Sequence, residues 1–262
     1  MVNAILIPVL IVAGIGLIAG VGLAIASALM AVPVDEREQA VQEILPGANC
    51  GACGYSGCSG YAAALASGEA VNGLCAPGGA KVAAQISAAL GIEAADVERK
   101  TAVVHCLGTY DNTSDKLEYQ GVNSCAAAMQ LYGGLASCAF GCVGLGDCAS
   151  VCDYGAISVC NGVASVNREL CVGCSKCVRT CPKGIISLER ASTTAVYCSS
   201  RVKGGETRKV CKAGCIGCMK CTKVCEAGAI TVTDFCASVD SSKCTGCGKC
   251  IEVCPAKIVK LR

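Results

Sequence analysis

The chain opens on a long uncharged segment, and every charged residue follows it. Residues 1–34 contain no Asp, Glu, Lys or Arg, and the run from Ala4 to Val34 is 31 residues long. A helix that spans a bilayer needs about 20 apolar residues. A secretory signal peptide would have a basic start and a shorter apolar core. The pattern therefore predicts one uncleaved N-terminal transmembrane helix within residues 1–34.

Beyond this helix the pattern of apolar and polar positions predicts short elements. Apolar residues at helical spacing predict a helix over Asp35–Leu45, and the alanine-rich stretches Ser59–Ser67 and Lys81–Leu90 predict two more. The segment Thr101–Cys106 predicts a strand. Residues 107–124 are polar and rich in Gly and Asn, which is typical of a boundary between modules. We expect an α+β protein.

The composition indicates that a metal or covalent cross-links hold the fold together. Among 262 residues there are 26 cysteines but only seven Tyr, two Phe and no Trp. So few large apolar side chains cannot build one large core, and this cysteine content is typical of disulfide- or metal-built proteins. The net charge of +2 and the single histidine, His105, give no support to a nucleic-acid partner or to histidine-based hydrolysis. We expect His105 to be structural.

An internal repeat organises the second half of the chain. Nine cysteines recur at an offset of 73 residues, too many matches for chance. The repeat predicts two copies of one unit, over residues 125–190 and 198–262. The paired positions are Cys125 and Cys198, Cys138 and Cys211, Cys142 and Cys215, Cys148 and Cys221, Cys152 and Cys225, Cys171 and Cys244, Cys174 and Cys247, Cys177 and Cys250, and Cys181 and Cys254.

The cysteine spacing indicates iron–sulfur clusters. Each copy ends in the pattern C-x2-C-x2-C-x3-C-P, and the second copy carries the same spacing earlier, at Cys215, Cys218, Cys221 and Cys225. In this pattern three thiolates surround one four-iron cluster and the fourth binds the neighbouring cluster. Structural zinc sites use separate pairs of cysteines, often with histidine. Disulfides are disfavoured because so many thiolate ligands require a reducing compartment.

These motifs, together with the block Cys50, Cys53, Cys58 and Cys75, make the chain resemble a known family. Residues 125–262 resemble two tandem bacterial ferredoxins, each with two [4Fe-4S] clusters. The earlier block resembles the four-cysteine [4Fe-4S] domain of the B subunit of the Rnf complex, and the order of parts is similar along nearly the whole chain. The domains expected are a transmembrane helix (1–34), a juxtamembrane segment with the four-cysteine domain (35–92), a connecting segment (93–124) and two ferredoxin-like modules (125–190 and 198–262).

The ferredoxin pattern implies four ligand sets in the two modules. Three sets follow the pattern directly. Leu145 stands where Cys218 would predict a ligand, so we expect Cys138 to replace it in the fourth. With the four-cysteine domain this gives 20 ligands and five clusters. The module sets are Cys215, Cys218, Cys221 and Cys254; Cys225, Cys244, Cys247 and Cys250; Cys152, Cys171, Cys174 and Cys177; and Cys138, Cys142, Cys148 and Cys181.

Six cysteines stay outside these sets. Cys160 and Cys236 break the repeat, and we expect them to be small buried apolar residues. A sixth cluster is an alternative for the other four, although their spacing fits the known runs loosely. They are Cys106, Cys125, Cys198 and Cys211.

The resemblance implies an electron-transfer subunit of a membrane-bound, Na⁺- or H⁺-translocating ferredoxin:NAD⁺ oxidoreductase. It implies soluble ferredoxin as electron donor and membrane subunits as acceptors, with the cluster domains on the cytoplasmic side of the cell membrane. We expect no catalytic residue and no nucleotide on this chain, because no phosphate-binding loop is present. The alternatives are a polyferredoxin-type carrier of another redox complex, a catalytic iron–sulfur reductase and a zinc-stapled membrane adaptor.

Overall fold

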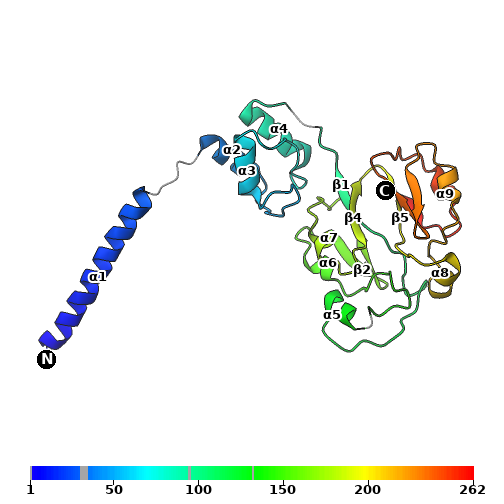
Figure 1. Cartoon of the computed structure of the whole chain (residues 1–262), viewed down its shortest axis with the longest axis horizontal. Coiled ribbons are helices and arrows are strands. Elements are labelled where there is room, and N and C mark those ends of the chain that lie inside the picture. The colour runs from blue at the N-terminus through cyan, green and yellow to red at the C-terminus, as the bar shows by residue number, and fades with distance from the viewer. Residues whose placement is uncertain (1, 30–34, 94–95, 132) are drawn as a thin grey trace.

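The computed structural model describes residues 2–29, 35–93, 96–131 and 133–262, and it combines short helices with two-stranded sheets (Figure 1). In chain order the elements are α1 (Val2–Leu29), α2 (Glu36–Ile44), α3 (Cys58–Ala66), α4 (Gly79–Leu90), β1 (Lys100–Val104), α5 (Cys125–Gln130), α6 (Asp147–Ser150), β2 (Ile157–Cys160), β3 (Val163–Val166), α7 (Lys176–Thr180), β4 (Ile186–Arg190), β5 (Thr194–Val196), α8 (Gly204–Val210), α9 (Lys220–Lys223), β6 (Ile230–Thr233), β7 (Cys236–Val239), α10 (Lys249–Glu252) and β8 (Val259–Leu261).

Helix α1 confirms the predicted apolar helix. Its segment Leu10–Ser27 has a mean hydropathy of 2.4, and none of it is buried against the rest of the protein. By length and composition this helix can cross a membrane. The last part of the predicted span, residues 30–34, lies outside the described residues.

Three helices build the four-cysteine domain, in agreement with the predicted helical segments. Helix α2 packs on α3 and α4, and Val41, Tyr61 and Ile86 are the most deeply buried side chains between them. The Tyr61 hydroxyl donates to the Val71 carbonyl at 3.0 Å and accepts from the Leu74 amide at 3.2 Å. These bonds hold the loop that leads into Cys75.

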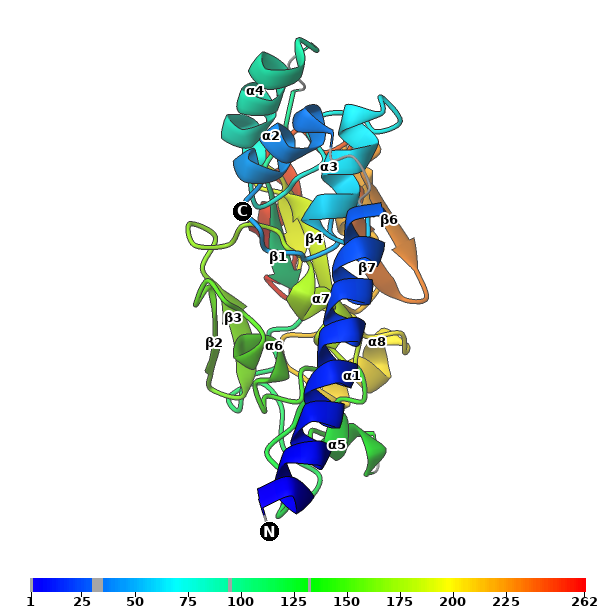
Figure 2. The same ribbon diagram turned by 90° about the vertical axis from the view of Figure 1, so that its left-hand side faces the viewer.

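Four two-stranded antiparallel sheets form the rest of the protein. They pair β1 with β4, β2 with β3, β5 with β8 and β6 with β7. In Figure 2 the hairpins β2–β3 and β6–β7 stand on opposite sides of the β1–β4 pair. Strand β1 was expected in the connecting segment, but its residues Lys100–Val104 pair with β4, from Arg190 to Ile186. Module 1 therefore extends back to residue 100, beyond the boundary expected at 125.

The pairing of β5 with β8 gives module 2 (residues 194–262) the same plan as module 1 (residues 100–190). Strands β4 and β8 begin 73 residues apart, at Ile186 and Val259, and each pairs with the first strand of its module. Cys106 and Cys198 each stand two residues after that first strand, 92 residues apart. Module 1 thus contains 19 extra residues between this cysteine and the repeat that follows. The structural equivalent of Cys198 is Cys106, and the sequence match with Cys125 is fortuitous.

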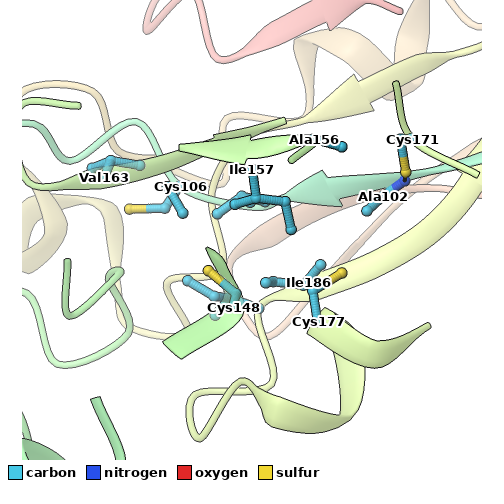
Figure 3. Close-up of a cluster of buried hydrophobic side chains, with 12 residues drawn as sticks. Ala102, Cys106, Cys148, Ala156, Ile157, Val163, Cys171, Cys177 and Ile186 are labelled. Carbon is cyan, nitrogen blue, oxygen red and sulfur yellow. Dashed lines mark hydrogen bonds between the residues drawn. The ribbon is translucent and has the colours of Figure 1, made fainter. Parts of the chain in front are cut away.

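Cysteines form a large share of both module cores. Buried Cys106, Cys148, Cys171 and Cys177 lie with Ile157 and other small apolar side chains in module 1 (Figure 3). Module 2 has the corresponding arrangement around Cys215, Cys221 and Cys250. A core of thiols and short side chains is cohesive only when the thiols are bound together, as the scarcity of aromatic residues led us to expect.

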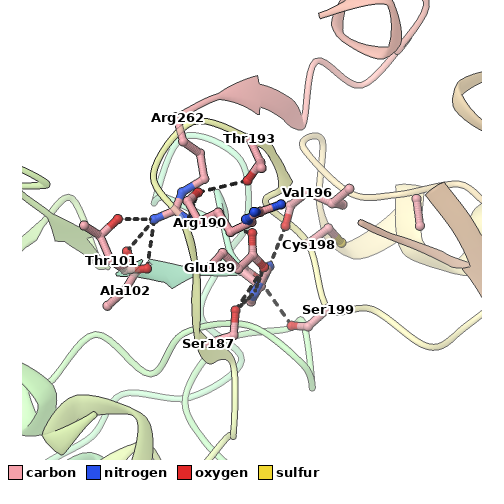
Figure 4. A network of polar contacts seen from close by, with 12 residues as sticks. Thr101, Ala102, Ser187, Glu189, Arg190, Thr193, Val196, Cys198, Ser199 and Arg262 are labelled. Atoms are coloured by element: carbon pink, nitrogen blue, oxygen red, sulfur yellow. Dashed lines mark hydrogen bonds and ion pairs between the residues drawn. The ribbon is translucent and has the colours of Figure 1, made fainter. Parts of the chain in front are cut away.

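A polar clasp joins the two modules (Figure 4). The Arg262 side chain at the end of β8 is fully buried and donates to the carbonyls of Thr101 at 2.9 Å and Arg190 at 3.1 Å. His105 bonds to the Val196 carbonyl through Nδ1 at 2.7 Å, and its Nε2 lies 2.7 Å from the Ser187 hydroxyl. His105 is therefore a structural residue of the interface, as expected.

Candidate metal centres

The cysteines surround spaces rather than points. Among the described residues, no group of three or more Cys, His, Asp and Glu side chains is close enough to hold a single metal ion. Instead, cysteine-lined cavities of about 390, 330 and 330 Å³ occupy the modules. A four-iron cluster needs its four thiolates arranged around such a space.

The first set lies in the four-cysteine domain and has the membership expected. Burial raises the pKa of the Cys75 thiol, and the nearby Cys58, Cys50 and Cys53 raise it further. The Asn49 side chain accepts from the Cys58 amide at 2.8 Å and thereby holds the loop against the start of α3. These four side chains are neighbours, as a cluster requires.

The second set lies in module 1 and also has the expected membership. Cys152, Cys171, Cys174 and Cys177 line one cavity of about 330 Å³. The Ala102 amide of β1 donates to the Cys171 sulfur at 3.3 Å. Strand β1 thus supplies a hydrogen bond to this site, a role that the expected boundary had excluded.

The third set corrects the expected membership. Cys142, Cys148 and Cys181 share a cavity with Cys125, whereas Cys138 does not line it. The Asp147 carboxylate accepts from the Cys125 amide at 2.8 Å and from the Ala126 amide at 3.0 Å, which fixes α5 beside α6. The 19 extra residues of module 1 therefore bring Cys125 to the place that Leu145 leaves without a thiol.

A further set lies between the modules. Cys106, Cys138, Cys198 and Cys211 line one cavity of about 390 Å³, two cysteines coming from each module. Burial raises the pKa of Cys211, and the nearby Cys138 and Cys198 raise it further. The alternative sixth set contained Cys125, so Cys125 and Cys138 exchange places relative to both expectations.

Equivalent hydrogen bonds connect this inter-module set to each module. The Cys142 amide donates to the Cys106 sulfur at 3.3 Å, and the Cys215 amide donates to the Cys198 sulfur at 3.2 Å. Amides two residues onward, at Gly108 and Ser200, donate to the same two sulfurs. The two modules therefore approach the shared cavity in the same way, so that the site has approximate internal symmetry.

Module 2 carries the last two sets with the expected neighbours. Burial raises the pKa of Cys221 to about 11, with further contributions from Cys215, Cys218 and Cys254. Cys244 and Cys247 act on Cys250 in the same manner. Cys225 packs against the same core. Cys218 and Cys247 are exposed, which leaves one ligand of each set at the surface.

Cys160 and Cys236 stand outside all six sets. Cys160 is exposed, contrary to the expectation of a buried residue. Cys236 is half-buried, and its thiol donates to the Cys198 carbonyl at 3.3 Å. Hydrogen bonding with Cys236 lowers the pKa of both Cys198 and Cys215. Cys236 therefore contacts two neighbouring ligand sets without belonging to either.

The donor chemistry of these sites fits iron–sulfur clusters. Burial raises the pKa of Cys106 to about 11 and that of Cys148 to about 12, so both are neutral thiols at pH 7 without metal. Iron must displace their protons, and metal binding then contributes directly to folding. The backbone N–H groups directed at Cys106, Cys171 and Cys198 stabilise thiolate charge after that displacement.

Sequence reasoning missed the roles of Cys106 and Cys125, although one signal was present. Thr101 to Cys106 resembles Thr193 to Cys198, with a short β-branched strand followed by a cysteine in both. That similarity has an offset of 92 rather than 73, so a search at one fixed offset does not detect it. The insertion hid the equivalence.

Comparisons with known proteins agree with these sites. Family models described as "Putative Fe-S cluster", "4Fe-4S binding domain" and "4Fe-4S dicluster domain" match residues 45–77, 163–186 and 214–258. The chain is 40% identical to the B subunit of the ion-translocating oxidoreductase complex of Methanosarcina acetivorans, over 96% of both chains. It belongs to the family of Rnf complex B subunits.

Two further Rnf B subunits show the same similarity. The chain is 43% identical to the B subunit of the Na⁺-translocating ferredoxin:NAD⁺ oxidoreductase complex of Acetobacterium woodii, over 93% of this chain and 74% of the relative. It is 37% identical to the B subunit of the proton-translocating ferredoxin:NAD⁺ oxidoreductase complex of Clostridium ljungdahlii, over 92% of this chain and 86% of the relative. An electron-transfer subunit with several iron–sulfur clusters is the identity that these relatives share with the expected one.

Proposed function

We propose that this chain is a membrane-anchored subunit that carries electrons from reduced ferredoxin toward the membrane subunits of an Rnf-type complex. The observation that carries the proposal is the series of neighbouring cysteine sets that runs from the four-cysteine domain to module 2. When bound, [4Fe-4S] clusters supply one-electron transfer. The role of the chain is to hold them close together, exclude water and stabilise thiolate charge.

The proposed ligands are 24 of the 26 cysteines, in six sets of four. Five sets cover the residues already expected, with Cys125 in place of Cys138 beside Cys142, Cys148 and Cys181. The sixth set is the inter-module one. The two cysteines without this role are Cys160 and Cys236.

Helix α1 is proposed to span the membrane, with the cysteine-bearing domains on its cytoplasmic side. The support is the length and exposure of Leu10–Ser27 and the need of free thiolates for a reducing compartment. No residue of the chain is assigned to bond-making chemistry at NAD⁺, which falls to another subunit of the complex.

Iron and sulfide analysis of anaerobically purified chain tests this proposal. Six clusters require about 24 irons and as many acid-labile sulfides per chain, whereas five require about 20. Reduced ferredoxin should bleach the visible absorption of the purified chain. A chain that dithionite reduces but ferredoxin does not would contradict the proposed electron donor.

A further inference from the structure

Two bulky apolar residues of module 2 occupy backbone positions suited to glycine. Met219 has φ +57° and Phe235 has φ +62°, and their side chains are 50% and 46% exposed. The equivalent residues of module 1, 73 positions earlier, are Gly146 and Gly162, with φ +86° and +78°. A large side chain in this region costs about 1–3 kcal/mol unless something compensates. Module 2 therefore keeps two strained, exposed side chains that its own fold does not need.

Both residues border an exposed ligand of the candidate cluster site. Cys218 directly precedes Met219 and is exposed. Phe235 lies against the same loop, because a Cβ on Gly217 would stand 3.0 Å from the Phe235 carbonyl oxygen. Cys218, Met219 and Phe235 thus form one surface, which we call the Cys218 face.

The equivalent face of module 1 is covered by its own chain. A Cβ on Gly162 would lie 2.9 Å from the Tyr110 ring, and the Tyr110 amide donates to the Asn161 carbonyl at 3.2 Å. Tyr110 belongs to the 19-residue expansion of module 1. The same surface is therefore closed by the chain in one module and open, with apolar side chains, in the other.

Charge distinguishes the two modules as well. Residues 194–262 carry 12 Lys and Arg against 5 Asp and Glu, a net charge of +7, whereas residues 1–193 carry 10 against 15, a net charge of −5. Lys220 and Lys223 are exposed along α9, directly after Met219. Their equivalents in module 1 are Asp147 and Ser150. Asp234 is the acidic residue beside Phe235.

We propose that the Cys218 face, with Lys220 and Lys223, is the docking surface for a small acidic protein that carries single electrons. An apolar centre with a basic rim fits such a partner, since the charges steer the encounter and the apolar contact excludes water. One electron leaves the reduced carrier, which becomes oxidised, and one is gained at the cluster held by Cys215, Cys218, Cys221 and Cys254. No bond is formed or broken. This inference rests on the proposed function, in which the carrier is ferredoxin.

The test measures binding of an acidic 2[4Fe-4S] ferredoxin to the purified full chain at low ionic strength, without electron transfer. Lys220→Glu combined with Lys223→Glu should weaken binding at least about tenfold. Lys243→Glu combined with Lys260→Glu makes the same change of charge elsewhere on module 2 and should weaken it less than about twofold. Equal weakening by both pairs, or by neither, overturns the docking surface.

A second variant separates docking from folding. Met219→Gly combined with Phe235→Gly installs the glycines of module 1, so it relieves the backbone strain. It should weaken ferredoxin binding at least about tenfold without lowering the melting temperature or the iron content. A lower melting temperature would show that both side chains are packing residues and overturn the inference. So would unchanged ferredoxin binding with lost assembly onto the membrane subunits.

Reduction by dithionite distinguishes this inference from the proposed function. If dithionite and ferredoxin both reduce the charge-reversed chain as fast as the unaltered one, the electron-relay function stands and the docking surface is wrong. If dithionite reduces the unaltered chain but ferredoxin neither binds nor reduces it, the proposed donor is wrong and the surface loses its occupant.

Discussion

Leu145 and Cys125 illustrate how single positions decide the ligand sets. Leu145 stands where module 2 has Cys218, and Cys125 from the inserted segment lines the cavity of Cys142, Cys148 and Cys181. Asp147 holds Cys125 there through its amide. This frees Cys138 for the inter-module cavity, where it faces its repeat partner Cys211. One substitution in the repeat is thus linked to the assignment of two other cysteines.

Iron analysis of cysteine variants tests that assignment. Cys138→Ala and Cys211→Ala should each lose about four irons, and the double variant should lose no more, because both side chains serve one cluster. Cys125→Ala combined with Cys138→Ala should lose about eight. Cys160→Ala is the control and should keep all its iron. A Cys125, Cys138 double variant that loses only four irons would return both residues to one site.

A rescue variant sharpens the same point. Leu145→Cys recreates in module 1 the spacing found at Cys215, Cys218 and Cys221. Added to Cys125→Ala, it should restore the four lost irons, whereas added to Cys138→Ala it should restore none, since residue 145 belongs to the other cavity. Rescue of Cys138→Ala would instead support the ligand set expected from sequence.

Strands β4 and β8 bring the modules together through the clasp around Arg262. Its buried guanidinium bonds to backbone carbonyls of β1 and β4, and Glu189 lies 3.9 Å away. Burial lowers the pKa of Arg262, while the nearby Glu189 opposes that effect. A buried cation held mainly by carbonyls is costly to remove, because the acceptors and Glu189 lose their partner.

Removing the clasp should therefore loosen the inter-module site. Arg262→Ala should lower the free energy of unfolding by about 3 kcal/mol or more. A chelator should also extract about four irons from it faster than from the unaltered chain, with the remaining irons retained. Anaerobic guanidinium unfolding followed by visible absorption measures the first effect. Arg201→Ala, an exposed arginine of module 2, is the control. Uniform iron loss from all sites would place the effect on global stability alone.

Helix α7 makes the contact between module 1 and the four-cysteine domain. Arg179 in its last turn donates to the Cys50 carbonyl at 2.6 Å. Cys53 and Cys171, from two different ligand sets, line one shared cavity at this junction. The contact holds the first and second sets side by side, which the proposed relay requires.

Loss of this hydrogen bond should release the domain without affecting its metal. Arg179→Ala should raise the rate of proteolysis within residues 91–99 about fivefold, which corresponds to ~1 kcal/mol for an exposed hydrogen bond. Iron content should not change. Arg168→Ala removes another exposed arginine of module 1 and should leave proteolysis unaltered. Equal rates for both variants would show that other contacts hold the domain.

Much of the molecule could be predicted because its motifs are local. The apolar helix, the helices at α2, α3 and α4, the strand at β1 and the cysteine runs all follow from short-range patterns, and the structure contains them. The inter-module site could not be predicted in the same way. Its ligands come from segments up to 105 residues apart, from Cys106 to Cys211, and depend on the pairing of β1 with β4. A fixed repeat offset assigned Cys125 wrongly because an insertion shifts the alignment.

The separation of α1 from the cysteine-bearing domains makes the anchor removable. Its described side chains contact none of those domains, since Leu10–Ser27 is entirely unburied, and each domain has its own core and ligand sets. Deleting residues 1–34 should therefore leave a soluble chain with the same iron content, because folding is coupled to each domain's own metal. Ultracentrifugation and iron analysis of residues 35–262 measure both outcomes. Retention in the membrane fraction of cells that lack the other subunits would identify a second membrane contact. Loss of iron would show that α1 supports the fold.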